Sequence, residues 1–320
     1  MKVYIITCHN CYNFGASLQA FALQKYIKDS YEADCKTIHY VPYYMDYSVR
    51  YKRIPKKWSS FFKKIIWCAY HYPIIASYHF RRKKFDHFLD SFISHTKKVT
   101  TYNKIITVCN DGDVFICGSD QIWNGMIYEN GKDPSFFLSF VNSGKKLSYA
   151  ASFGGESVSP ITEKLIPNLK DFSGVSVREE KGRKILEKYN ISSEVVVDPV
   201  FLISREEWSR LSCLTKSKKR NYILVYGLDN LDALESIAKK YSSRYKIIVI
   251  GEMGFKNKNV FYFKNAGPLD FLYLVKNAVY VITNSFHCIA FSLIFGTPFM
   301  VLKREVGINQ RIFKTMLSHC

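Results

Sequence analysis

His287 is the residue whose type and position best suit proton-transfer chemistry. It follows Asn284 and Ser285, which come directly after the β-branched run 279–283. Histidine has an ordinary pKa of about 6.5, so it can donate or accept a proton at neutral pH. The free backbone N–H groups in the first turn of a helix favour an anion. The pattern predicts an acid/base histidine beside an anion site, although a structural histidine near a helix cap fits it equally well.

A second polar cluster follows the strand expected at 113–117. Ser119, Asp120 and Gln121 come directly after Gly118, and Trp123 lies two residues further on. Polar groups at a strand end can hydrogen-bond sugar hydroxyls, and an indole ring offers a stacking face. The cluster therefore indicates a sugar-binding loop. The structural alternative is that Asp120 caps a helix.

Two further polar residues follow expected strands. Arg178 comes after a short strand at 174–177, and Ser152 follows a strand at 146–151. An arginine at a strand end can hold a phosphate or carboxylate with two parallel hydrogen bonds. Pairing with Glu179 or Glu180 is the structural alternative for Arg178.

The loop at 10–15 follows the first expected strand, at 3–7. It contains Asn13 and Gly15 and precedes a helix expected at 16–27. A loop rich in Asn and Gly can approach a ligand closely. It lacks the spaced glycines of a dinucleotide fingerprint, so no such cofactor is expected.

The nine cysteines occur without a signal peptide, which favours a reducing, cytoplasmic compartment. Cys8 and Cys11 have the two-residue gap of a redox or zinc pair. No second pair with ligand spacing follows, so free thiols are expected and no metal site.

The elements that must position these residues alternate between strands and helices throughout the chain. Near His287, Ser285 is expected to cap a short helix with its hydroxyl, and Gly296 with Pro298 ends that helix. Strand, helix and returning strand form a right-handed crossover, which places the helix start at the ligand-binding edge of a parallel sheet. The alternation predicts an α/β protein with two Rossmann-like, doubly wound domains facing a cleft. We place them at 1–165 and 166–320.

The segment at about 45–100 is basic and aromatic. The chain has a net charge of +19, and residues 49–104 hold fourteen Lys or Arg against Asp86 and Asp90, a local charge of +12. Apolar spacings of three and four predict two amphipathic helices. These could lie on an anionic membrane surface through 50–98, or simply cover a sheet with their lysines solvated. The longest apolar run, 65–78, is too short to span a bilayer.

Together these motifs resemble the polysaccharide pyruvyl transferase family. The resemblance rests on blocks in family order over nearly the whole chain, at 13–24, 118–124, 148–154, 177–180, 198–199 and 283–287. It implies a fold similar to the two-domain GT-B arrangement. It also implies transfer of the carboxyvinyl unit of phosphoenolpyruvate to hydroxyls of a cell-envelope glycan or its lipid-linked precursor, forming a pyruvate ketal.

The resemblance also assigns roles to residues. His287 matches the catalytic histidine, Arg178 a donor-binding arginine and Asp120 an acceptor-side acid. Further donor contacts are expected from Asn284, Ser285, Phe286 and Cys288, and further acceptor contacts from Asn13, Gly15, Ser119, Gln121, Trp123 and Ser152. The chemistry calls for one acid/base group and an anion clamp, with no metal or other cofactor.

The chain departs from the family pattern at two places. Several members carry an arginine two residues before the histidine, where this chain has Ser285. Members also commonly continue with a helix that crosses back to the first domain, whereas this sequence stops at Cys320, so a shortened second domain is expected.

Two rival functions remain open from the residues alone. A GT-B-like fold also suits a glycosyltransferase with a nucleotide-sugar donor, because a fold does not fix a function. The high positive charge suits nucleic-acid binding, although no recognised nucleic-acid motif accompanies it.

Overall fold

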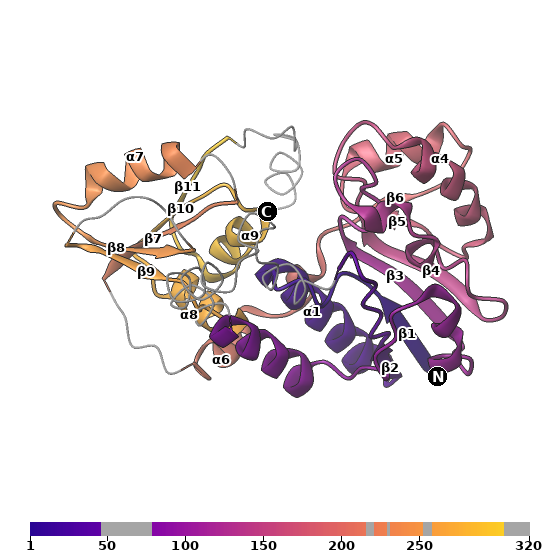
Figure 1. Cartoon of the computed structure of the whole chain (residues 1–320). Helices are drawn as coiled ribbons and strands as arrows, with labels where there is room; N and C mark the ends of the chain where they lie inside the picture. The colour runs from indigo at the N-terminus through magenta and orange to yellow at the C-terminus, as the bar shows by residue number, and fades with distance from the viewer. Residues whose placement is uncertain (46–78, 216–220, 229–230, 252–257, 304–320) are drawn as a thin grey trace, which may run out of the picture.

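The computed structural model describes residues 1–45, 79–215, 221–228, 231–251 and 258–303 (Figure 1). Within them the chain forms two parallel sheets, each with helices against it. The α/β class predicted from the alternation of strands and helices is confirmed.

The first sheet has six strands in the order β2-β1-β3-β4-β5-β6. Its strands are β1 (Lys2–Ile6), β2 (Asp34–Thr37), β3 (Val114–Asp120), β4 (Lys145–Ala151), β5 (Ser176–Val177) and β6 (Glu194–Val195). The helices of this half are α1 (Phe14–Tyr31), α4 (Pro160–Leu165) and α5 (Glu180–Glu187), with short 3-10 turns η2 (Tyr102–Lys104), η3 (Ile106–Val108), η4 (Glu129–Lys132), η5 (Pro134–Phe137) and η6 (Ile166–Asp171).

The second sheet has five strands in the order β11-β10-β7-β8-β9. Its strands are β7 (Tyr222–Tyr226), β8 (Lys246–Ile250), β9 (Val260–Phe263), β10 (Tyr280–Thr283) and β11 (Phe299–Val301). The helices of this half are α6 (Arg205–Ser212), α7 (Leu231–Tyr241), α8 (Pro268–Lys276) and α9 (Phe286–Phe295), and the turn η7 (Pro199–Leu202) leads into it.

The change from one sheet to the other lies between Val195 and Tyr222. The boundary expected at residue 165 comes too early, because β5 and β6 pair within the first sheet. Each of these strands has only two residues. Hydrophobic pattern cannot show which sheet so short a strand joins, since that depends on pairing far along the chain.

A shared apolar core joins the two halves. Phe14 of α1 stacks on Phe271 of α8 with 4.7 Å between ring centroids, and Phe21 of α1 lies 5.6 Å from Trp208 of α6. These side chains belong to one buried cluster. Figure 1 shows α1, α8 and α9 between the two sheets. The first half is therefore packed against the second through α1.

A helix at 79–92 also contributes to this core, lying beside α1 in Figure 1. Phe85 and Phe88 are buried in the shared cluster, and Lys84 forms an ion pair of 2.7 Å with Asp270 of α8. The expectation of an amphipathic helix here is confirmed, but it covers the junction of the halves and its Lys84 is not merely solvated. The other predicted amphipathic helix and most of the basic segment lie in 46–78, outside the described residues.

No helix in the described part of the chain is long and apolar enough to cross a membrane.

Candidate functional site

The turn between β10 and α9 places His287 at the junction of the two halves. Ser285 has the extended conformation of an N-cap residue, but its side chain makes no capping hydrogen bond. Its backbone N–H donates to Thr283 Oγ1 at 3.0 Å, so the predicted hydroxyl cap is wrong. Asn284 accepts from the Leu228 N–H at 2.9 Å through Oδ1, which ties the turn to the end of β7. The first N–H groups of α9 thus receive no side-chain cap.

Gly15 leaves the space that the imidazole of His287 occupies. A Cβ atom at Gly15 would lie 2.0 Å from His287 Nδ1. His287 is 8% exposed. Asn13 caps α1 by accepting from the Ala16 N–H at 3.2 Å, which starts the helix directly before Gly15. The first turns of α1 and α9 therefore meet at one imidazole ring, and each half supplies one of them.

Asp198 links His287 to Arg178. Its Oδ2 atom lies 3.0 Å from Arg178 Nη1 and 3.5 Å from His287 Nε2, and it accepts from Ser119 Oγ at 3.3 Å. Its Oδ1 atom accepts from the Val200 N–H at 3.1 Å. Burial alone would raise the pKa of this carboxyl, but its interactions with the His287 imidazole and with the Arg178 guanidinium hold the pKa well below its usual range. Asp198 is therefore an ionised carboxylate in the core.

Arg178 is a buried cation surrounded by acids and an aromatic ring. Its guanidinium lies 4.5 Å from the centre of the Phe286 ring, and 3.8 Å separates it from both Asp120 and Glu179. Burial would lower the pKa of Arg178, but Asp198, Asp120 and Glu179 raise it above its ordinary value. The guanidinium stays charged, so any anion that binds here must compete with these carboxylates.

Asp120 sits at the end of β3 in a left-handed backbone conformation, with φ of +66°. Such values are uncommon for residues other than glycine, although Asp tolerates them better than most. Its Oδ1 accepts from the Gln121 N–H at 2.8 Å, and its side chain is 23% exposed. Asp120 is thus a partly accessible carboxylate on the first-half side of Arg178.

Glu179 is a second buried acid, and its pKa is raised whereas that of Asp198 is lowered. Burial raises the pKa of its carboxyl, while the charge of Arg178 and the hydrogen bond of 2.7 Å from Ser152 Oγ oppose the rise. Two buried carboxyl groups around one arginine therefore have pKa values pushed apart. That combination is typical of sites that move protons.

Three buried polar atoms of this cluster have no hydrogen-bond partner among the described residues. They are Arg178 Nε, Glu179 Oε2 and His287 Nε2. Buried polar atoms are normally paired, and unpaired ones call for a functional or solvent explanation. Here the three atoms could bind an anionic or hydroxyl-bearing ligand.

The structure brings His287, Arg178, Asp120, Phe286 and Gly15 together, as the predictions for a joint site require. Other predicted contacts are structural. Trp123 is fully buried, donates from its indole N–H to the Phe136 carbonyl at 2.9 Å, and cannot stack on a sugar. It fills the core because η5 folds back over the strand end.

The remaining predicted contact residues are mostly held by protein partners. Ser152 bonds Glu179, Ser119 bonds Asp198, and Gln121 Oε1 accepts from Asn124 at 2.8 Å. Cys288 is fully buried, and burial raises the pKa of its thiol to about 12. Ser119 and Ser152 thus support the acids of the site and do not line it.

Sequence reasoning missed Asp198 and Glu179 as site residues. Asp198 enters the prediction only within the family block at 198–199, and Glu179 only as a possible structural partner of Arg178. Both lie just after strands of the first sheet, at the edge where parallel sheets place functional groups. That position was the available signal.

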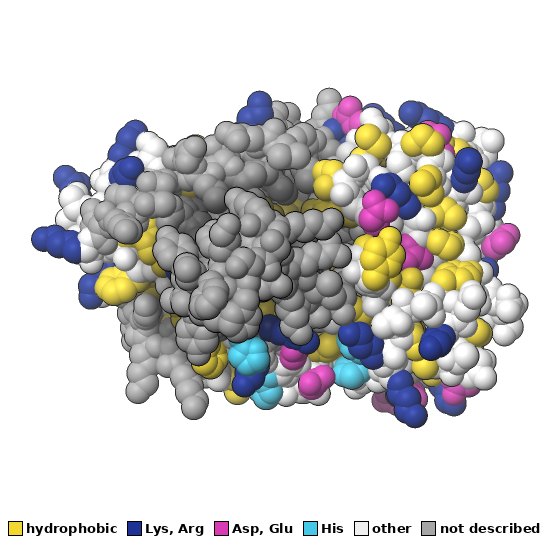
Figure 2. Space-filling model, viewed as in Figure 1, with side chains coloured by type: hydrophobic (Ala, Val, Ile, Leu, Met, Phe, Trp, Pro, Cys, Tyr) yellow, Lys and Arg dark blue, Asp and Glu magenta, His cyan; other side chains and the backbone are white. Residues whose placement is uncertain are grey.

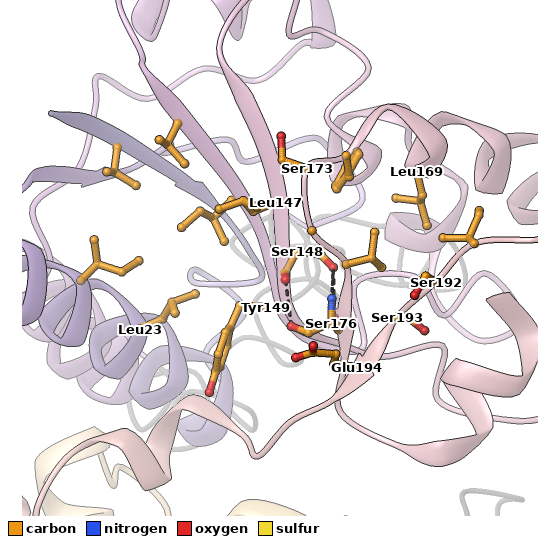
Figure 3. A pocket seen from close by; sticks show the side chains of 18 of the residues that line it. Leu23, Leu147, Ser148, Tyr149, Leu169, Ser173, Ser176, Ser192, Ser193 and Glu194 are labelled. Carbon is orange, nitrogen blue, oxygen red and sulfur yellow. Dashed lines mark hydrogen bonds between the residues drawn. The ribbon is translucent and has the colours of Figure 1, made fainter. Parts of the chain in front are cut away.

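A separate pocket of about 1,090 Å³ lies on the α1 side of the first sheet (Figure 3). Leu23, Leu147 and Tyr149 form part of its walls, and Ser148 and Ser176 hydrogen-bond one another beside them. None of the predicted site residues lines it, and Lys170 and Glu194 are the charged side chains among the described residues that do. The pocket therefore does not coincide with the His287 site.

Within the described ranges, no three His, Cys, Asp or Glu side chains are grouped so as to hold a metal ion. Cys8 and Cys11 are both free thiols there.

Two solved structures that are similar in fold are described as UDP-N-acetylglucosamine 2-epimerases. UDP-GlcNAc 2-epimerase from Neisseria meningitidis, bound to UDP-GlcNAc, has a TM-score of 0.54 and 12% identity, over 100% of this chain and 91% of that chain. A putative UDP-N-acetylglucosamine 2-epimerase from Listeria monocytogenes has a TM-score of 0.53 and 11% identity, over 99% and 87%. At such identities the likeness shows the fold alone, which is GT-B-like with Rossmann-like domains. The predicted fold is thereby confirmed.

No curated protein sequence matches the chain. The sequence profile of the polysaccharide pyruvyl transferase family matches residues 13–305, which include every residue of the site around His287. The chain therefore belongs to the polysaccharide pyruvyl transferase family, a family of enzymes.

Proposed function

We propose that this enzyme transfers the carboxyvinyl unit of phosphoenolpyruvate to hydroxyls of a cell-surface polysaccharide or its precursor, forming a pyruvate ketal. The observation that carries the proposal is the position of His287 at the meeting of two helix starts, beside Asp198 and the Arg178–Phe286 pair. No metal or further cofactor enters the proposal.

The reaction needs a proton donor and a place for an anion. Protonation of the methylene carbon of phosphoenolpyruvate leaves an oxocarbenium-like centre at the neighbouring carbon, which a sugar hydroxyl attacks while losing its proton. Phosphate then leaves, and a second hydroxyl closes the ketal. His287 Nε2, buried and without a hydrogen-bond partner, suits the transfer to carbon.

The donor's negative charge would be met by Arg178 and by backbone N–H groups in the first turns of α1 and α9. Ser285 occupies the place where several family members have arginine, so the charge supplied by the turn itself is smaller here. The start of α9, where Ser285 provides no side-chain cap, favours an anion and supports this assignment, whereas in α1 Asn13 already accepts from the Ala16 N–H. The carboxylates around Arg178 oppose it, so donor binding should exchange carboxylate contacts of Arg178 for phosphate or carboxylate oxygens of the donor.

The proposal is tested by transfer in deuterated water, with the purified chain, phosphoenolpyruvate and a panel of lipid-linked and free glycans. We expect phosphate release that needs both substrates, and a product methyl group carrying solvent deuterium. The His287→Gln variant should be slower by roughly 10²- to 10⁴-fold, the usual contribution of positioned acid/base catalysis. Full activity of that variant, or no release with an acceptor that a second family member pyruvylates, would contradict the proposal.

A nucleotide-sugar donor is the alternative outcome. A ligand that binds the native state raises the thermal midpoint according to its affinity. Phosphoenolpyruvate should therefore raise the melting temperature and UDP should not. The reverse result would favour a glycosyltransferase, and tight RNA or DNA binding at physiological salt would favour a nucleic-acid role.

A lipid-linked acceptor would bring the enzyme to the inner face of the cell membrane. Of the basic residues in the described helix at 79–92, Arg81 contacts Phe14 and Lys84 binds Asp270, so this helix is partly structural. Figure 2 shows Lys and Arg side chains spread over both halves of the visible face. The seven basic residues at 50–64 lie outside the described part. Charge reversal at Lys56, Lys57, Lys63 and Lys64 should abolish sedimentation with anionic liposomes, and unchanged sedimentation would exclude this patch.

A further inference from the structure

Asp198 occupies a central position in the site, although it is too deeply buried to contact most ligands. Its side chain is fully buried, and one oxygen, Oδ2, faces three groups: Arg178, Ser119 and His287. Arg178 and Ser119 belong to the first half, whereas His287 belongs to the second. A single carboxylate atom thus joins the cation and the imidazole of the site.

The imidazole of His287 is confined on both sides. The Nδ1 edge of the ring occupies the space that a side chain at Gly15 would fill. On the other side, Nε2 lies 3.5 Å from the carboxylate of Asp198. A carboxylate beside one imidazole nitrogen attracts the proton to that nitrogen and fixes the ring orientation. The distance is longer than a hydrogen bond, so Nε2 remains open to a ligand group as well.

From these contacts we infer that Asp198 is a positioning residue of the transferase. It keeps a proton on Nε2 of His287 and holds the imidazole in place beside Arg178, which the same oxygen also contacts. The inference rests on the proposed function for its kinetic consequences, but the placement of the proton can be tested without any activity.

Other groups near Asp198 do not replace it in this role. Asp120 and Glu179 lie 3.8 Å from Arg178, and neither has a contact with His287 among the described interactions. Burial and the nearby negative charge of Asp198 raise the pKa of the Tyr149 phenol, so this phenol stays neutral. Asp198 is the carboxylate that reaches the imidazole.

The kinetic test uses Asp198→Asn, which keeps the shape of the side chain and removes its charge. We expect kcat to fall roughly 10²-fold, because an acid/base contribution is lost, while the dissociation constant of phosphoenolpyruvate does not rise by more than about 3-fold, because the variant removes a carboxylate that competes with the donor for Arg178. The double variant with His287→Gln should be no slower than His287→Gln alone, within about 2-fold, because residues that act as a unit are not additive. Multiplicative losses would overturn the inference.

The spectroscopic test uses nitrogen-15 spectra of the imidazole groups, with the His287 signals assigned by their loss in His287→Gln. In the wild type we expect a proton on Nε2, and in Asp198→Asn a larger fraction of rings with a bare Nε2. The exposed His87 serves as the control that neither change affects. A bare Nε2 in the wild type would overturn the inference, and that result does not depend on how Asp198→Asn folds.

The two proposals can fail separately. A wild-type enzyme that ignores phosphoenolpyruvate but shows a protonated Nε2 that depends on Asp198 would contradict only the proposed function. An enzyme that transfers pyruvyl groups but whose His287 spectra and rates do not respond to Asp198 would contradict only the positioning role.

Discussion

Single residues decide whether this site can act, and Gly15 shows how closely they are fitted. Its lack of a side chain is what allows the ring of His287 to lie against the start of α1. The sequence indicated Gly15 as a residue near a ligand. The structure gives it a different task, which is to make room for the catalytic candidate from the other half.

Replacement of Gly15 by Ala should displace His287. The new methyl would lie 2.0 Å from Nδ1, closer than any real contact, so the ring or α1 must move. Overpacking of this kind typically costs about 1–3 kcal/mol of unfolding free energy. We expect that loss in chemical denaturation, together with loss of transferase activity.

Gly155→Ala is the matched control, because a Cβ there would meet only the Ser157 N–H nitrogen at 3.9 Å. It should leave stability within about 0.5 kcal/mol, as surface substitutions usually do. Equal stability and activity in Gly15→Ala and Gly155→Ala would contradict the described packing.

At the scale of elements, a histidine cluster connects the ends of β1 and β2. His9 Nε2 and His39 Nδ1 are 2.8 Å apart, His39 lies beside His95, and His95 Nε2 is 3.4 Å from Asp90. Burial lowers the pKa of His9 to about 4 and that of His39 to about 3. Charge repulsion from His95 lowers both pKa values further, and repulsion from His9 lowers that of His39. Lys98 also opposes a positive charge on His39.

These pKa values predict acid sensitivity of the fold. In the unfolded chain the same histidines titrate near their ordinary value of about 6.5, so between that value and about pH 4 the unfolded state binds more protons. The contribution of these neutral histidines to the free energy of unfolding is therefore fully present above that range and is lost as the pH falls. The loss reaches up to about 2 kcal/mol per histidine at pH 5.

The check is chemical denaturation at pH 7 and pH 5. Between the two pH values, His39→Gln should lose less unfolding free energy than the wild type. Substitution of the exposed His87 should leave that loss the same as in the wild type. An equal pH dependence in the wild type and His39→Gln would show that the cluster is not the acid-sensitive element.

The sequence predicted most elements because their signals are local. The strands expected at 3–7 and 146–151 and the helix expected at 16–27 are observed as β1, β4 and α1, with bounds that differ by at most four residues. The cap at Ser285, the burial of Trp123 and the pairing of Asp198 depend on partners far along the chain. Neither hydrophobic spacing nor turn chemistry could reveal those partners.

At the scale of the whole molecule, the two halves share a core, and the site lies where they join. Phe14 and Phe85 from the first half pack with Phe271 and Phe291 from the second. The site residues come from both halves as well, so the geometry around His287 depends on this packing.

Phe271→Ala should therefore weaken both sheets together. Removing a fully buried phenylalanine typically costs about 3–5 kcal/mol. Because Phe271 stacks on Phe14, amide exchange should rise in β1 and β3 as well as in β7 and β10.

Phe140→Ala is the control, because this buried phenylalanine belongs to the separate core of the first half. It should raise exchange mainly in the first sheet. If Phe271→Ala raised amide exchange only in the second sheet, the result would contradict a shared core.

The most direct test of a donor site at the junction is calorimetric titration of phosphoenolpyruvate into the wild type and Arg178→Gln. We predict binding to the wild type that weakens roughly 10- to 100-fold in the variant, since a hydrogen bond to a charged group contributes about 1.5–3 kcal/mol. UDP should not bind. Equal affinity of both proteins for phosphoenolpyruvate, or binding of UDP but not of phosphoenolpyruvate, would contradict the account.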